Sequence, residues 1–186
     1  MIKAKLKKTD NSKPLGELLR QVADMQVFVG IPEEKAVRKW EKKWSSVNNA
    51  QLLYIHTNGS EKMKIPARPV IEPAIEAKGN KEMITEELRK ALDSLLDKKP
   101  GQASIHLKRA GMIGQNVSRA WFTDARNGWA PNSPLTARAK MWRLKGKAKK
   151  EFNDRISAGE SMQGISRPLI DTGQLRKAIT YVVGKG

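Results

Sequence analysis

Cysteine is absent from the 186 residues, and histidine occurs only twice, as His56 and His106. Without cysteine the chain forms no disulfide, has no thiolate nucleophile and offers no sulfur ligand to zinc. Two histidines leave few groups for acid–base or metal chemistry. We therefore expect no metal ion and no cofactor.

Long apolar runs are also missing. No stretch approaches the roughly 20 consecutive apolar residues that a transmembrane helix needs. The first ten residues, MIKAKLKKTD, are charged but have no apolar segment behind them, so they do not have the pattern of a secretory signal. These absences predict a protein made in a cytosol-like compartment and without a membrane partner.

Sequence patterns of common active sites are missing too. Neither the phosphate-loop pattern GxxxxGK[ST] nor the zinc pattern HExxH occurs. A hydrolase or transferase needs a base, an acid or nucleophile, and a clamp for the developing charge. Carboxylates such as Glu72 and Asp171 lie far apart in the chain and have no patterned partner. The sequence therefore predicts that the protein is not an enzyme.

Positive charge is the strongest feature of the composition. Lysine and arginine number 36 against 19 acidic residues, which gives a formal net charge of +17. Such a charge favours nucleic acid or an acidic protein surface as a neighbour. The densest basic stretch is a helix expected over 136–150. Its candidate surface residues are Arg138, Lys140, Arg143, Lys145, Lys147, Lys149 and Lys150.

The order of apolar patterns predicts an α+β fold. Gln26–Gly30 and Ala178–Val183 are short runs of the kind that form buried strands. Pairing of these two runs closes a small antiparallel sheet between the two ends of the chain. Several helices lie between them in the sequence, and this arrangement is typical of α+β proteins.

A long antiparallel helix pair is expected in the middle of the chain. Apolar residues recur at helical spacing over 69–99 and again over 102–121, with a bend or break at Gly79. Gly111 and Gly114 leave one face of the second helix thin. We interpret that face as a contact between helices rather than a phosphate-binding loop.

The remaining segments are assigned by composition. We expect one domain over 1–186, with a flexible basic arm at 1–13 and a mobile loop at 153–168. Asp171 or Thr172 is expected to cap a short helix before the last strand.

Five strings follow one another along the chain in a familiar order. They are VFVGIPEEKA at 27–36, A…YIHTNGS at 50–60, IPARPVIEPAI at 65–75, GWAPNSPLTARAK at 128–140 and PLIDTGQLRKAITYVV at 168–183. Together they resemble the neck and tail-completion proteins of tailed bacteriophages, a family that includes virion morphogenesis and minor tail proteins. The chain departs from the family pattern at Val70 and at Thr57-Asn58.

The resemblance implies a structural virion protein of the head–tail connector, assembled in the host cytoplasm and located in the neck or tail. It implies a ring of identical subunits, commonly sixfold, that completes the tail and joins it to the head. The partners would be copies of the chain and the connector or stopper, tail terminator and tail tube proteins. The basic surface would face packaged DNA in the lumen or an acidic neighbouring ring. A free, non-specific DNA-binding protein is the alternative function.

Candidate residues for contacts between subunits come from the same strings. They are Arg68, Pro66, Pro69, Trp129, Trp142, Asp171 and Thr172. Arg68 is expected to pair with a carboxylate, either on a neighbouring subunit or within its own. The two tryptophans either anchor an interface or cover the core.

Overall fold

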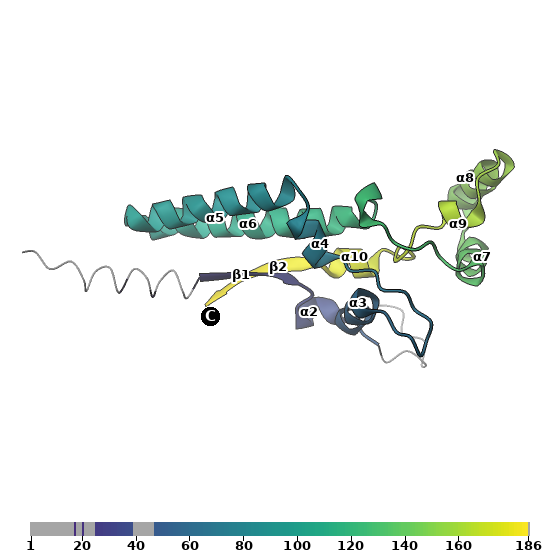
Figure 1. Cartoon of the computed structure of the whole chain (residues 1–186), viewed down its shortest axis with the longest axis horizontal. Helices are drawn as coiled ribbons and strands as arrows, with labels where there is room; N and C mark the ends of the chain where they lie inside the picture. The colour runs from purple at the N-terminus through teal and green to yellow at the C-terminus, as the bar shows by residue number, and fades with distance from the viewer. Residues whose placement is uncertain (1–16, 18–19, 21–24, 39–46, 186) are drawn as a thin grey trace, which may run out of the picture.

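The computed structural model describes residues 17, 20, 25–38 and 47–185. Its fold belongs to the α+β class, as the sequence predicts. A two-stranded sheet and a long helix pair lie along the long axis of the molecule, and short helices gather at one end of it (Figure 1). The arm predicted at 1–13 lies outside the described residues.

The sheet pairs segments from near the two ends of the chain. Strand β1 (Met25–Gly30) lies antiparallel to β2 (Thr180–Lys185), with Phe28 opposite Val182. This confirms the predicted pairing, although the second strand begins two residues later than expected. Ala178 instead ends a short helix, α10 (Gln174–Ala178).

The helix pair is also confirmed. Helices α5 (Asn80–Leu96) and α6 (Pro100–Trp121) run side by side (Figure 1), and α4 (Ile71–Glu76) precedes them. The break predicted between α4 and α5 occurs at Gly79, whose φ of 86° lies in the region that favours glycine.

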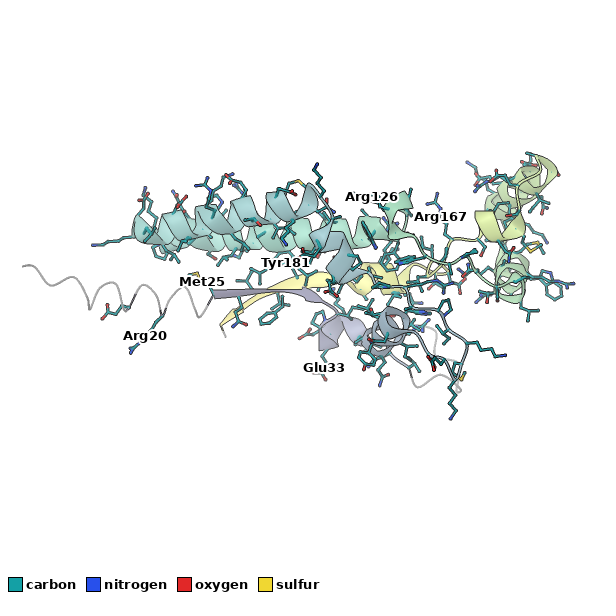
Figure 2. The ribbon with its side chains drawn as sticks, in the orientation of Figure 1. Arg20, Met25, Glu33, Arg126, Arg167 and Tyr181 are labelled. Atoms are coloured by element: carbon teal, nitrogen blue, oxygen red, sulfur yellow. The ribbon has the colours of Figure 1, made fainter. Side chains whose placement is uncertain are left out.

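Gly111 and Gly114 of α6 were predicted to contact another helix, and this prediction is wrong because they contact the sheet. A Cβ on Gly111 would lie 2.7 Å from Cγ of Tyr181, and one on Gly114 would lie 2.8 Å from Cγ2 of Val29. Tyr181 lies between β2 and the helix pair (Figure 2). The thin face of α6 therefore admits the sheet, and the sequence pattern alone does not distinguish a strand from a helix as the partner.

The core lies where α4, the C-terminal end of α6 and α10 meet. Its buried residues are Val70, Ala74, Trp121, Phe122, Leu175 and Ile179. Burial of these apolar side chains is the main favourable contribution to folding at this junction. The junction brings the segment after residue 65 next to the segment before β2.

Two helices follow β1. Helix α2 (Glu33–Ala36) is short, and α3 (Asn49–Asn58) begins with a capping box in which the Asn48 side chain accepts from Gln51 N. Gly59 ends α3 with a φ of 73°, and a Cβ there would lie 2.8 Å from Ala67 N. Glycine therefore lets the end of α3 lie directly against the IPARP segment.

The basic stretch forms two helices instead of one. Helix α7 (Pro134–Arg143) ends before Leu144, and α8 (Gly146–Ser157) starts from Gly146, whose φ is 54°. The expected helix over 136–150 is therefore wrong as a continuous element. The chain turns because Leu144 is extended and Gly146 adopts a left-handed conformation.

The segment 153–168 is not a loop throughout. Its first five residues are the last residues of α8, and Met162–Ile165 form α9. Two features hold this segment in place. Phe152 of α8 is buried, and Arg155 Nε donates to Glu160 Oε1 at 2.8 Å. A short 3₁₀ turn, η1 (Ala125–Asn127), completes the described elements.

Candidate functional site

Three of the segments that carry the family resemblance meet at one cleft. The cleft has a volume of about 640 Å³ and is lined by residues of the IPARP segment, of the loop and helix at 131–143, and of the segment 169–175. Leu52 and His56 of α3 close one side. We call it the motif cleft. Segments far apart in the sequence thus build one surface.

Arg68 joins two of these segments. Its Nε and Nη2 donate to the carbonyl oxygen of Ala130 at 3.2 and 2.9 Å, and Nη2 also donates to that of Pro131 at 3.2 Å. The residue is only 6% exposed, and burial lowers the pKa of its guanidinium. The prediction of a carboxylate partner is therefore wrong, because carbonyls of the same chain take its hydrogen bonds.

Trp129 covers the core. Its ring meets that of Phe122 edge to face, with centroids 5.8 Å apart, and its Nε1 donates to the carbonyl oxygen of Pro69 at 3.1 Å. Of the two alternatives for this tryptophan, the structure favours the core. Pro69 is half-buried and Pro66 is exposed.

Lys140 is a second internal clamp. Its Nζ donates to the carbonyl oxygens of Arg167 at 2.8 Å and of Ile170 at 2.7 Å. Burial lowers the pKa of this half-buried lysine, while Asp171 raises it by a smaller amount. The expectation of a solvated surface lysine is therefore wrong for Lys140.

The predicted cap at Asp171 is replaced by an ion pair. Asp171 Oδ2 lies 2.8 Å from Arg143 Nη1, and both side chains are exposed. Thr172 Oγ1 accepts a long hydrogen bond, 3.5 Å, from Gln174 N. The residue before α10 is Gly173, at a φ of 74°, and it supplies no side-chain cap. The polar groups of this turn thus connect it to α7.

A second cleft lies on the other side of this ion pair. It has a volume of about 490 Å³ and lies among α7, α8 and α9. Apolar residues line much of it: Met141, Leu144, Phe152, Ile165 and Ile170. We call it the apolar cleft. It shares Lys140, Arg143, Asp171 and Thr172 with the motif cleft.

His56 is the residue that sequence reasoning placed least well. The place of His56 in an amphipathic turn predicts a capping or satisfied histidine. Its buried Nδ1, however, has no hydrogen-bond partner among the described residues. Burial lowers the pKa of the imidazole, and the positive charges of Arg68 and Lys140 lower it further. Burial and the two neighbouring cations therefore all oppose protonation of the His56 imidazole.

Asn132 was missed altogether. It is 5% exposed, and its Nδ2 donates to both the carbonyl oxygen and Oγ of Ser166 at 2.8 Å. The residue ties the loop before α7 to the segment after α9. Its position between two prolines, in the string APNSP, is the signal that marks a fixed turn.

Four of the predicted basic surface residues lie near the start of α8 and are exposed to solvent. Lys145, Lys147, Lys149 and Lys150 are exposed, and Lys147 lies 3.8 Å from Glu151. We call these four lysines the basic cluster. On α7, the guanidinium of Arg138 lies 5.2 Å from the ring centroid of Trp142, which is 69% exposed. Trp142 is thus available for a contact.

Among the described residues, no group of three or more His, Asp or Glu side chains is placed to hold a metal ion. None of the helices described combines the length and apolar character required to cross a bilayer.

Comparison of the chain with protein-family models, with curated proteins and with solved structures finds no match. The motifs and the way the fold assembles them are therefore the basis for a function.

Proposed function

We propose that the protein is a structural subunit of a tailed-bacteriophage neck, which completes the tail and joins it to the head as one copy in a ring. The observation that carries the proposal is the motif cleft. The IPARP segment, the loop before α7 and the segment before α10 all carry the family resemblance, and all three line this cleft. Their common location supports the proposal, because it brings the three segments together on one surface.

The polar groups of the cleft support a scaffold. Arg68 and Lys140 donate to main-chain carbonyls of their own chain, so they hold segments in place. A surface that mates with neighbours needs this kind of rigidity, because ordering loops at an interface costs binding free energy.

Apolar side chains in solvent support contacts with other subunits. On the helix pair, Leu88, Leu92 and Leu96 are 41–56% exposed, and Ile105 and Met112 are 50% and 47% exposed. Leu88, Leu92 and Leu96 lie four residues apart, so they form a stripe along one side of α5. Exposed apolar stripes of this kind are typical of surfaces covered in an assembly.

The basic cluster favours a second candidate, non-specific DNA binding. Helix α8 has no acidic residue in its first turn and no side-chain cap, so positive side chains gather at the positive end of the helix dipole. In the neck this cluster would face packaged DNA or an acidic ring. As a free DNA-binding protein, the chain would bind duplex DNA with an affinity that falls steeply as salt rises.

The two candidates differ in a simple experiment. Replacing Lys145, Lys147, Lys149 and Lys150 together with Glu is expected to block joining of heads and tails while leaving the fold intact. Mass spectrometry of purified virions is expected to find the wild-type chain as a component. Wild-type assembly by the charge-reversed variant, or virions that lack the chain, would refute the proposal.

A further inference from the structure

The motif cleft and the apolar cleft share a wall. Lys140, Arg143, Asp171 and Thr172 line both of them. Lys140 is fixed by two carbonyls, but Arg143 and Asp171 are 60% and 43% exposed and bond to one another. The top of the wall is therefore a solvent-facing ion pair between a polar cleft and an apolar one.

The motif cleft is positively charged. Among the described residues that line it, the basic ones are Arg38, Lys64, Arg68, Lys140 and Arg143, and the only acidic one is Asp171. Like charges gathered in a concave surface raise the local potential, because low-dielectric walls screen them less than water does. This cleft therefore favours a negatively charged occupant.

The apolar cleft adds a different requirement. Its volume of about 490 Å³ lies within the range of roughly 300–1,000 Å³ that small-molecule and side-chain sites occupy. Phe152 comes from α8, Ile165 from α9 and Met141 from α7, and Leu144 follows α7 directly. Arg155 and Arg167 are the basic residues found here but not in the motif cleft, and Glu151 is the acidic one. An occupant that fits both clefts carries apolar side chains next to acidic ones.

The ion pair on the wall indicates which anion the surface takes. Arg143 already bonds a carboxylate, that of Asp171, at 2.8 Å. Exposed ion pairs contribute little to stability, so an incoming carboxylate can replace Asp171 on Arg143 at small cost. The guanidinium presents several N–H donors and can bond two carboxylate oxygens together.

We propose that the two clefts bind an acidic peptide segment of another protein, with an apolar side chain in the apolar cleft and carboxylates on Arg143 and across the motif cleft. This inference rests on the proposed function, in which the segment belongs to an adjoining virion protein. Duplex DNA offers phosphates but no apolar side chain for the second cleft. In a second copy of the chain, basic residues outnumber acidic ones by 36 to 19, so it is a poor source of an acidic segment for this cleft.

The test is direct binding to the full chain. The probe is a fluorescein-labelled peptide with three repeats of Glu-Glu-Leu-Glu. Its binding is measured by fluorescence anisotropy. Two matched peptides serve as controls, one with Gln in place of every Glu and one with Ser in place of every Leu. We expect the probe to bind and both controls to bind at least about tenfold more weakly, because each lacks one of the two required contacts.

Three variants locate the site. Arg143→Gln is expected to weaken binding of the probe about tenfold, through loss of a charge-assisted hydrogen bond. Asp171→Asn is expected to strengthen it, because the internal competitor for Arg143 is removed. Arg138→Gln is the matched control, since Arg138 lies on the same helix, is exposed and lines neither cleft.

Opposite effects at Arg143 and Asp171 separate binding from folding, because damage to the fold would weaken binding in both variants. Equal loss in Arg143→Gln and Arg138→Gln, equal binding of the Gln peptide, or displacement of the probe by duplex DNA would overturn the inference. Sedimentation measures whether the chain associates with itself. Loss of probe binding under conditions in which it does so would also overturn the inference, because a second copy would then occupy the clefts. If the probe does not bind but virions contain the chain, the peptide inference fails and the neck function is kept. If the probe binds but virions lack the chain, the neck function fails and the peptide inference is kept.

Discussion

Three cations, one buried and two half-buried, hold main-chain carbonyls of distant segments. Arg68 reaches the loop at 130–131, Lys140 reaches 167 and 170, and Arg119 donates to the carbonyl oxygen of Ile179 at 2.9 Å. Such bonds satisfy loop carbonyls that have no partner in a helix or strand. The cations therefore act as clamps that fix the clefts.

Arg68 offers the clearest test of a clamp. Arg68→Lys keeps the charge but loses the planar fork that reaches two carbonyls. It is expected to lower the free energy of unfolding in urea by about 2 kcal/mol, the usual range for hydrogen bonds to a charged donor. The exposed Arg138→Lys is expected to stay within about 0.5 kcal/mol of wild type. Equal unfolding free energies of the two variants would show that the hydrogen bonds from Arg68 to the carbonyls do not stabilise the fold.

His56 predicts a dependence of stability on pH. Because its pKa is lowered from 6.5 in the fold, an unfolded chain takes up this proton at a higher pH than the native chain does. The stability contribution is complete above pH 6.5 and is lost as the pH falls toward the folded pKa. His56→Gln is expected to flatten the pH dependence of the unfolding free energy across this window, because it removes the group whose pKa is lowered in the fold. Parallel curves for wild type and His56→Gln would contradict this account.

Residue identities were easier to predict than their partners. The sequence marks Arg68, Trp129 and Asp171 as unusual, yet it assigns a carboxylate to Arg68 and a helix cap to Asp171 or Thr172. The structure gives carbonyls to the first and Arg143 to the second. Both true partners lie far away in sequence or on another element, and local propensity contains no information about them.

At the scale of elements, replacing glycines of α6 with alanine is expected to change stability in opposite directions at two positions. Gly111 faces Tyr181, where a Cβ would meet the ring, but nothing lies within 4 Å of a Cβ at Gly101 near the start of the same helix. Gly111→Ala is therefore expected to destabilise the fold by about 1–3 kcal/mol through overpacking. Gly101→Ala is expected to stabilise it, by up to about 1 kcal/mol, through helix propensity. Thermal unfolding of the two variants checks the signs, and a stabilising Gly111→Ala would refute the packing of the sheet on α6.

The first turn of α8 contains lysines and no acidic residue, so its charges are unfavourable at the positive end of the helix dipole. Lys149→Glu is expected to raise the stability of the monomer by about 1 kcal/mol, because it replaces a positive charge with a negative one near the positive helix end. Lys149→Gln, which only removes the charge, is expected to give about half of this. Thermal unfolding at low salt measures both. A loss of stability in Lys149→Glu would contradict the assignment of this helix start.

Helices and strands were predicted well where the pattern is long or closed by clear signals. The helix pair, the break at Gly79 and the pairing of the two strands all follow from periodicity and turn residues. The prediction fails over 136–157, because a continuous basic stretch hides the turn at Leu144 and Gly146. It fails at the glycines of α6 because a thin helix face accepts either a helix or a sheet.

At the scale of the whole molecule, charge and exposed apolar area support the proposal that the protein works within an assembly. The net charge is +17, and exposed leucines, Ile105 and Met112 lie on the helix pair. Both features have a cost in an isolated chain, since like charges repel and exposed apolar groups favour aggregation. Neighbours of opposite charge and matching apolar surfaces would remove both costs.

Electron microscopy of particles assembled with and without this chain tests the central claim most directly. The account predicts that without the chain heads and tails form separately, so that tailless heads and free tails accumulate, and that adding the wild-type chain restores joined particles. Complete, joined particles in the absence of the chain would contradict it.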